Sequence, residues 1–203
     1  MKTWRMFSVA FAAVAAAALG IGVALHRAPP AGPALQGGLL LPEPRPITEF
    51  SLTDQDGKPF DRTRLLGHWS LVFVGYTRCP DVCPNTLAVL KALEPRLGST
   101  LGLVFVSVDP QRDTPDILKQ YVRYFSPNLV GATGTPDQLE RLSASLGVAS
   151  IKVPGKSESD YTIDHSAALV LVNPAAQVAG YFQPPHKVDT LADDLAVVLG
   201  KRA

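Results

Sequence analysis

The fold is set by residues 69–84, which read WSLVFVGYTRCPDVCP. The first half of this stretch is an apolar run rich in valine and phenylalanine, which is typical of a central strand buried on both faces. A polar loop with two cysteines follows directly, and Pro84 suits the first turn of a helix that runs to about Leu97. The sequence therefore predicts that Cys79 and Cys83 lie where a buried strand gives way to a helix.

On either side of this stretch, patterns typical of strands alternate with patterns typical of helices. The Asp56-Gly57 pair marks a turn into a second edge strand. Strands are expected at 49–53, 69–76, 101–108, 167–172 and 178–182. Helices are expected to start at the two Thr-Pro-Asp sequences, 114–116 and 135–137, and a last helix is expected at 187–199. A polar loop is expected at 154–160. This order predicts an α/β domain with a central mixed sheet flanked by helices, in a thioredoxin-like topology with insertions.

Composition indicates a single globular domain. The chain has 203 residues, of which 46% are hydrophobic and 18% are charged, so it is long enough for one well-buried core. Its formal net charge is +1 and it has no run of lysine or arginine, so nucleic acid is not an expected partner.

The N-terminal segment 1–27 predicts a location. Lys2 and Arg5 precede an uncharged stretch at 6–25, which as a helix is about 30 Å long and spans a bilayer core. A cleaved secretory signal is the alternative, but twenty uncharged residues exceed its usual apolar core, so we favour an uncleaved transmembrane anchor. Both interpretations place the domain outside the cytoplasm, on the periplasmic side.

Segment 28–46 is dense in proline, glycine and alanine. Such a composition predicts a semi-extended spacer that builds no core and holds the domain off the membrane. The folded domain is then expected to cover 47–203.

The chain has two cysteines, separated by three residues. The start of a helix is expected to lower the pKa of nearby thiols and so favour the thiolate. A structural disulfide is the weakest interpretation because so short a loop restricts the unfolded chain little, and the flanking prolines and Asp81 argue against plain core packing. Redox chemistry and metal binding remain, and three intervening residues let two sulfurs converge on one ion.

Four histidines are available as a further ligand. His26 and His68 are most simply solvated residues, and His186 is a weak outside candidate. His165 directly precedes the expected strand 167–172, whose start should face the end of the cysteine-bearing strand. From this context a ligand role and a hydrogen bond to loop backbone both stay open. Two thiolates with one imidazole suit Cu(I), or zinc if a fourth ligand is present.

Three separated motifs together resemble the Sco/SenC family. They are YTRCPDVCP at 76–84, SVDPQRDTP at 107–115 and DHS at 164–166, in the family's order and at similar distances. The resemblance covers residue 47 to the C-terminus, and an N-terminal anchor is also usual for the family. It implies a thioredoxin-like fold and one copper ion, Cu(I) or Cu(II), bound by Cys79, Cys83 and His165.

The resemblance also implies a role and partners. The expected role is that of a metallochaperone that delivers copper to, or prepares, the binuclear copper centre of cytochrome c oxidase. The expected partners are the copper-accepting oxidase subunit, an upstream copper donor, and the membrane through the N-terminal helix.

Other motif residues receive lesser roles. Asp164 is expected to orient the imidazole by accepting its second N–H, although a neighbouring side chain can equally point away. Asp81 is interpreted as a partner-facing or loop-stabilising residue. The motif at 107–115 is interpreted as structural, because it ends a strand, turns and caps the next helix.

The alternative function is a thiol-disulfide oxidoreductase that reduces the cysteines of the copper-accepting target, with Cys79 and Cys83 as a redox-active disulfide. The three-residue spacing argues against it, as does the lack of a proline just before 167–172, where thioredoxin-like oxidoreductases place a cis-proline. Both activities can coexist, because a disulfide abolishes both thiolates. A peroxidase is a third and weaker interpretation that only the fold resemblance suggests.

Overall fold

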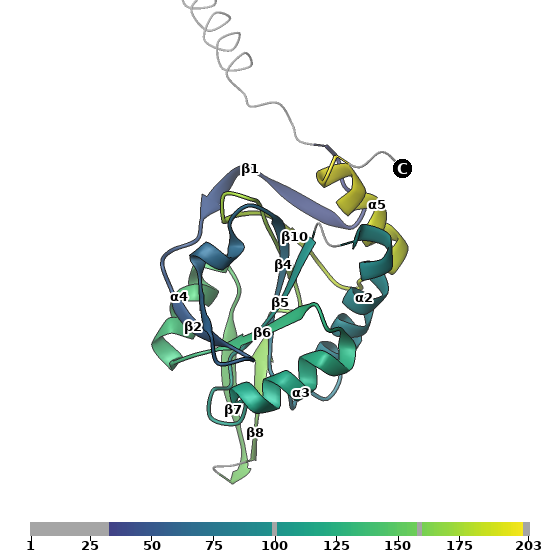
Figure 1. Ribbon diagram of the computed structural model, residues 1–203. Helices are drawn as coiled ribbons and strands as arrows, with labels where there is room; N and C mark the ends of the chain where they lie inside the picture. Colours follow the sequence, from purple (N-terminus) through teal and green to yellow (C-terminus); the bar gives the residue numbers. More distant parts are fainter. Residues whose placement is uncertain (1–32, 99–100, 158–159, 201–203) are drawn as a thin grey trace, which may run out of the picture. The chain divides into compact units, whose positions relative to one another are not determined.

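The structure is a computed structural model that describes residues 33–98, 101–157 and 160–200. The described residues belong to one compact unit that starts at Pro33 (Figure 1). The transmembrane anchor predicted at 1–27 lies outside the described residues. Within the described ranges, none of the helices combines the length and the apolar character that crossing a membrane requires.

An eight-stranded mixed sheet forms the centre of this unit, in the order β1-β10-β9-β4-β5-β6-β2-β3. Strands β4, β5 and β6 run parallel, and the remaining neighbours in the sheet pair antiparallel. The α/β mixed sheet predicted from the sequence is therefore confirmed. The strands are β1 (Gly38–Pro46), β2 (Ser51–Asp54), β3 (Pro59–Asp61), β4 (Trp69–Gly75), β5 (Leu101–Ser107), β6 (Leu129–Thr133), β9 (Leu169–Val172) and β10 (Gln177–Phe182).

The helices begin where the sequence signals predict. Thr114 accepts a hydrogen bond from the backbone N–H of Ile117 at 3.4 Å and so caps its helix, whose first residue is a proline. Pro84 lies in the first turn of the helix after the cysteine loop, where its missing N–H leaves no hydrogen bond unmade. The helices are η1 (Arg62–Leu65, a 3-10 turn), α2 (Val82–Leu97), α3 (Pro115–Phe125), α4 (Pro136–Leu146) and α5 (Val188–Val198).

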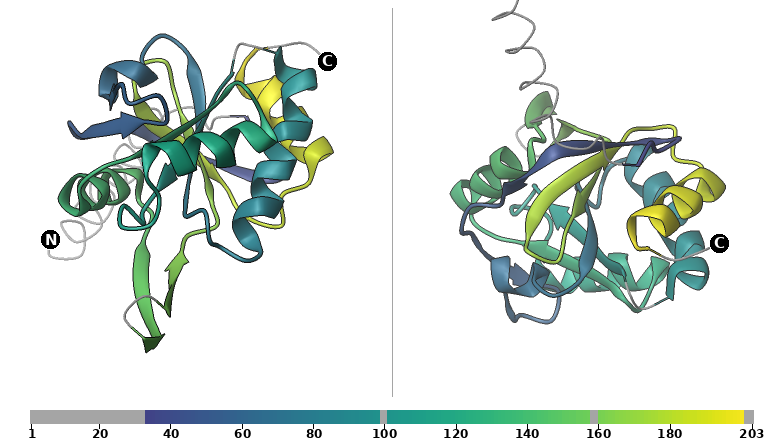
Figure 2. Two further views of the ribbon diagram at one scale, coloured as in Figure 1. Left: turned by 60° about the horizontal axis from the view of Figure 1, so that its bottom comes forward. Right: turned by 90° about the horizontal axis from the view of Figure 1, so that it is seen from above.

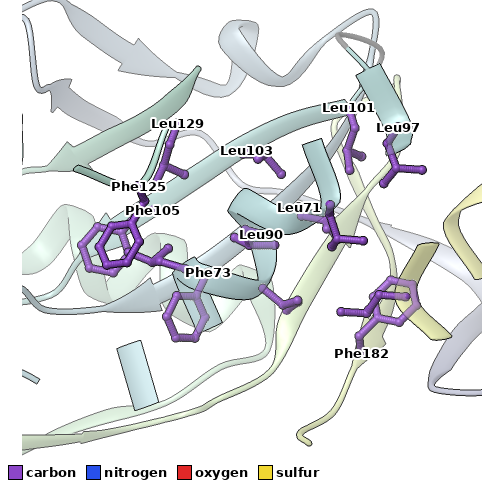
Figure 3. Packing of buried hydrophobic residues seen from close by; sticks show 14 of the residues in the cluster. Leu71, Phe73, Leu90, Leu97, Leu101, Leu103, Phe105, Phe125, Leu129 and Phe182 are labelled. Atoms are coloured by element: carbon purple, nitrogen blue, oxygen red, sulfur yellow. The ribbon is translucent and has the colours of Figure 1, made fainter. Parts of the chain in front are cut away.

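The central strand β4 separates two apolar layers. Leu71 and Phe73 pack with residues of α2, α3 and α5 on one face (Figure 3). Val72 and Val74 pack with residues of α4 and of the β2–β3 hairpin on the other. Successive strand residues point to opposite faces, so an apolar run without alternation is what a strand covered on both sides needs. The helices on both sides of the sheet are visible in Figure 2.

The first strand is a correction to the predicted spacer at 28–46. Gly38–Pro46 pairs antiparallel with β10 at the edge of the sheet, and the pairing is irregular between Leu40 and Arg45, where two of the prolines lie. Proline is compatible with an edge strand because one side of the strand needs no partner. The Asp194 carboxylate accepts hydrogen bonds from the two residues just ahead, Gln36 and Gly37, each at 2.8 Å. The sheet thus begins before Ile47.

A second correction concerns residues 154–160, predicted as a polar loop. Residues 154–157 and Asp160 belong instead to an antiparallel hairpin of β7 (Ser150–Ser157) and β8 (Asp160–His165), which forms a two-stranded sheet of its own. In Figure 2 this hairpin projects away from the main sheet. Its first strand is almost wholly exposed, so its polar sequence carries no signal of burial. Strand β6 was also absent from the sequence-based expectations.

Candidate metal centre

The cysteine loop connects the buried end of β4 to α2. The backbone N–H of Cys79 donates to the carbonyl of Tyr76 at 3.3 Å, which turns the chain after the strand. Cys83 lies in the first turn of α2 and is fully buried, whereas Cys79 is half-buried. Both are free thiols, and the backbone N–H of Cys83 donates to Sγ of Cys79 at 3.4 Å. The strand-to-helix placement predicted from the sequence is confirmed.

His165 ends β8 and points its ring at both sulfurs. Its Nε2 lies 3.3 Å from Sγ of Cys83 and 3.7 Å from Sγ of Cys79. Its Nδ1 lies 3.1 Å from the carbonyl oxygen of Ser166. A carbonyl only accepts hydrogen bonds, so Nδ1 carries the proton and Nε2 presents its lone pair to the sulfurs. This is the tautomer that a metal ligand through Nε2 requires.

Two aromatic rings hold the imidazole in place. The ring centroids of Phe73 and Tyr76 each lie 5.9 Å from that of His165, with interplanar angles of 70° and 90°. Edge-to-face contacts of this kind favour one ring orientation. The orientation of His165 is thus fixed by the core at the end of β4 as well as by its own strand.

The other residues singled out from the sequence do not join this cluster. Asp164 is exposed, and the proton on Nδ1 of His165 goes to the Ser166 carbonyl, so the expected role of Asp164 in orienting the imidazole is wrong. Asp81 is exposed and accepts from the side-chain amide of Asn85 at 2.5 Å, which fits a loop-stabilising residue. His68 and His186 hydrogen-bond backbone carbonyls elsewhere, and His26 lies outside the described residues.

The electrostatics of Cys83 differ from the expectation of a lowered thiol pKa. Burial raises the pKa of the Cys83 thiol well above its ordinary value, and proximity to Cys79 adds to the rise. Loss of solvation therefore outweighs the favourable effect of the helix start, because an unpaired thiolate in an apolar site has little to stabilise it. Burial likewise raises the pKa of Tyr76. A cation between the ligands would supply the missing stabilisation of a Cys83 thiolate.

The three donor atoms fit one metal ion. Proteins bind metals at about 2.3 Å through thiolate sulfur and about 2.0 Å through imidazole nitrogen, so three donors around one ion lie about 3.5–4 Å apart. Here the three atoms all lie within 4.8 Å of one another. Among the described residues, no further histidine, cysteine or carboxylate joins these three as a fourth ligand. A closed four-ligand zinc site is therefore not formed by these residues, and the soft set of two sulfurs and one nitrogen favours Cu(I).

The site opens to solvent on one side. A hollow of about 390 Å³ lies beside Cys79 and His165, between the cysteine loop and β8. It is lined by Tyr76, Cys79, Pro80, Asp81, Val82, Thr162, Ile163, Asp164 and His165. An ion held by the three donors would thus be reachable by an incoming ligand, while Cys83 stays covered by the core.

Sequence reasoning missed a set of polar residues just behind the cluster. Asp113 is fully buried and accepts a hydrogen bond from the cysteine loop, while Asp109 and Arg112 form hydrogen bonds with Tyr161 of β8. All three belong to the motif at 107–115, which was interpreted as structural. Several charged residues in one short loop, directly after a buried strand, were the signal that could have identified them.

Comparisons with known proteins identify the family. Residues 41–200 match the SCO1/SenC family. A protein of Stutzerimonas stutzeri is 39% identical over 165 residues, which cover 79% of this chain and 80% of that protein. The mitochondrial SCO1 homolog 1 of Arabidopsis thaliana is 35% identical over 84% of this chain, which spans 49% of that longer protein.

A solved structure shows the same fold. The crystal structure of Arabidopsis thaliana ScoI with copper bound superposes with a TM-score of 0.70 at 34% identity, covering 76% of this chain and 98% of that one. The fold is thus the α/β, thioredoxin-like mixed sheet with flanking helices that the sequence predicted. From the match over residues 41–200 and these identities, we conclude that the chain belongs to the SCO1/SenC family.

Proposed function

We propose that this chain is a copper metallochaperone that holds one copper ion on Cys79, Cys83 and His165. The observation that carries the proposal is the placement of Nε2 of His165 at 3.3 Å and 3.7 Å from the two sulfurs, with its other nitrogen engaged by the Ser166 carbonyl. Two thiolates and an imidazole form a soft set that suits Cu(I). A relative of known structure that carries copper supports the choice of metal.

Transfer of the ion follows from the uneven burial of the ligands. Cys83 is covered, whereas Cys79 and His165 are half-buried beside the hollow. An acceptor's donor atoms can therefore approach from the hollow and replace His165 and Cys79 before Cys83. Three-coordinate binding leaves room for such an incoming ligand.

The destination of the copper is inferred from the family resemblance. We infer that the ion is delivered to, or used to prepare, the binuclear copper centre of cytochrome c oxidase, and that an upstream donor loads the chain. We further infer a membrane anchor at 1–27 and a domain on the extracytoplasmic side. The mitochondrial name of the Arabidopsis relative is in keeping with a role in respiratory-enzyme assembly.

The test is a titration of the reduced full chain with Cu(I) in detergent, without oxygen and against a competing chelator. We expect one copper per chain, and a large loss of affinity in His165→Ala with the fold retained. His68→Ala, which removes a half-buried histidine elsewhere, is the matched control and should bind as the parent does. Unchanged stoichiometry and affinity in His165→Ala would contradict the proposal.

The second candidate is a thiol-disulfide oxidoreductase, and the placement of the half-buried Cys79 beside the buried Cys83 at the start of a helix favours it. The more exposed Cys79, whose sulfur accepts from the Cys83 N–H, would attack a target disulfide. Cys83 would then resolve the mixed disulfide, so that the target gains two electrons and two thiols while Cys79 and Cys83 form a disulfide. A Cys83→Ser variant should trap the mixed disulfide, and its absence with the oxidised acceptor would exclude this activity.

A further inference from the structure

The loop that follows β5 lies behind both halves of the candidate metal centre. Ser107 at the end of β5 is the register partner of Gly75 at the end of β4, and the Val108 N–H donates to the Gly75 carbonyl at 2.9 Å. The loop therefore begins directly beside the start of the cysteine loop. It is defined here as residues 107–113.

Its first contact is with the cysteine loop. The carboxylate of Asp113, which is fully buried, accepts from the backbone N–H of Thr77 at 2.8 Å and from its hydroxyl at 2.6 Å. It also accepts from the hydroxyl of Ser107 at 2.5 Å. Three donors compensate for the burial of this carboxylate. Thr77 lies two residues before Cys79, so Asp113 fixes the backbone that leads to Cys79 and thereby the position of its sulfur.

Its second contact is with the histidine hairpin. Asp109, almost fully buried, accepts from the hydroxyl of Tyr161 at 2.6 Å and pairs with Nε of Arg112. Arg112 in turn donates from Nη1 to the Tyr161 carbonyl at 3.0 Å. Its guanidinium lies 3.6 Å from the centre of the Tyr161 ring and 5.7 Å from that of Tyr76. Tyr161 is thus held at its hydroxyl, its ring and its backbone.

Among the described residues, the hairpin is also attached by packing of Tyr161 and Ile163 against Tyr76 and by a hydrogen bond from Lys152 to Gln111 of the same loop at 3.3 Å. Strands β7 and β8 pair with each other and not with the main sheet, and an isolated two-stranded hairpin is marginally stable in water. In β8 the buried side chains are Tyr161 and Ile163. Because side chains two apart share a face of a strand, Tyr161, Ile163 and His165 lie on the same face. Fixing Tyr161 therefore fixes the direction in which His165 points.

We propose that Asp109 and Arg112 are positioning residues that bring His165 to the two cysteines by holding Tyr161, while Asp113 does the same for the cysteine loop through Thr77. This inference rests on the proposed copper site. One short loop thereby sets the distance between the histidine and the sulfurs, although none of its side chains is a ligand. The motif at 107–115 has a role in the metal centre that its sequence context alone did not indicate.

The test measures copper affinity and the spectrum of the Cu(II) form in the full chain. Arg112→Ala and Tyr161→Phe should each lower copper affinity about 10- to 100-fold, the usual effect of losing a partner that orients a ligand. They should also weaken the imidazole nitrogen couplings in the electron paramagnetic resonance spectrum. Arg141→Ala on α4 and Tyr124→Phe on α3, both exposed, are the matched controls and should leave affinity and spectrum unchanged. Tyr161→Phe keeps the ring, so it remains decisive if Arg112→Ala fails to fold.

Each variant is then combined with His165→Ala. If Arg112 acts through His165, adding Arg112→Ala should cause no further loss of affinity in that background. Thr77→Val, which breaks the Asp113 contact, acts on the cysteines and should keep its effect there. Parent-like binding by Arg112→Ala and Tyr161→Phe, or an Arg112→Ala effect that persists without His165, would overturn the positioning role while leaving the copper site intact. Parent-like binding by His165→Ala itself would instead reject the proposed function.

Discussion

The cysteines and the histidine of the candidate centre are carried by two very different regions. The cysteine loop leaves β4, which is buried along almost its whole length at the centre of the eight-stranded sheet. The histidine ends a two-stranded hairpin whose first strand is almost entirely exposed. A deeply buried region thus holds the sulfurs, and a largely exposed hairpin, attached to the core mainly through one face of β8, brings the nitrogen.

This difference suggests a division of labour. Local opening costs less free energy where few apolar contacts are buried, so the hairpin is expected to open before the core does. Withdrawal of His165 would then leave an ion on the two sulfurs, where an acceptor can reach it. The predictions below test how separate the two regions are.

The largest expected effect is the loss of Phe73, which is fully buried in β4 and contacts Phe105 and His165. Phe73→Ala should lower the free energy of unfolding by about 3–5 kcal/mol, because it removes a large buried ring and leaves a cavity. Ile151→Ala in the hairpin, where the side chain is 67% exposed, should change it by no more than about 0.5 kcal/mol. Urea denaturation of the copper-free protein measures both. Equal losses would contradict the prediction, because they would mean that the Ile151 side chain is packed as well as that of Phe73.

A smaller effect on stability, but a direct one on the site, is expected at Gly75. A Cβ atom there would lie 2.4 Å from Sγ of Cys83 and 3.1 Å from the Phe105 ring, so the backbone of β4 can approach the sulfur only as glycine. Gly75→Ala should cost about 1–3 kcal/mol through overpacking and should displace Cys83, which lowers copper affinity.

Gly131→Ala in β6 is the matched control for this substitution. Its Cβ would lie 2.8 Å from the Val122 side chain, away from the cysteines. It should destabilise the protein to a similar degree while leaving copper affinity as in the parent. A parallel fall in affinity in both variants would mean that the site responds to overall stability and not to the space beside Cys83.

The sequence predicted the parts of the molecule whose pattern is local. The apolar runs of β4 and β5 and the Thr-Pro-Asp starts of α3 and α4 appear where expected, because burial on both faces and helix capping are visible within a few residues. Strand β1 was missed because its prolines indicate a spacer, and only its pairing with β10 makes it a strand. The β7–β8 hairpin was missed because a pair of strands exposed to water needs no apolar alternation.

The candidate site divides in the same way. The spacing of Cys79 and Cys83 predicted that their sulfurs converge, and the family resemblance added His165. The contacts of Asp113 with Thr77 and of Arg112 with Tyr161 span 36 and 49 residues of sequence. No local pattern encodes such pairs, and the hydrogen bond that fixes the His165 tautomer goes to a backbone carbonyl that any residue provides.

The smallest expected effect lies at residues 166–168, which connect the hairpin to β9 and are called the joint below. His186 donates from Nε2 to the carbonyl of Ala167 at 2.9 Å, in the segment that leads from the hairpin into β9. Burial lowers the pKa of His186. In the unfolded chain a histidine takes up its proton near pH 6.5, whereas the folded protein resists protonation until a lower pH. The contribution of His186 to stability is therefore complete above about pH 6.5 and is lost as the pH falls below it.

Urea denaturation of the copper-free protein at pH 7.5 and pH 5 checks this sign. The parent should lose more stability on acidification than His186→Gln, which keeps a donor for the Ala167 carbonyl but cannot titrate. His68→Gln removes a different histidine and controls for the loss of one titrating group. The effect should be modest, because the His186 side chain is only half-buried and water screens part of the charge. If His186→Gln and the parent lose equal stability, protonation of His186 does not affect the free energy of unfolding. The attachment of the hairpin to the core through the Ala167 carbonyl, at the joint, is then independent of pH.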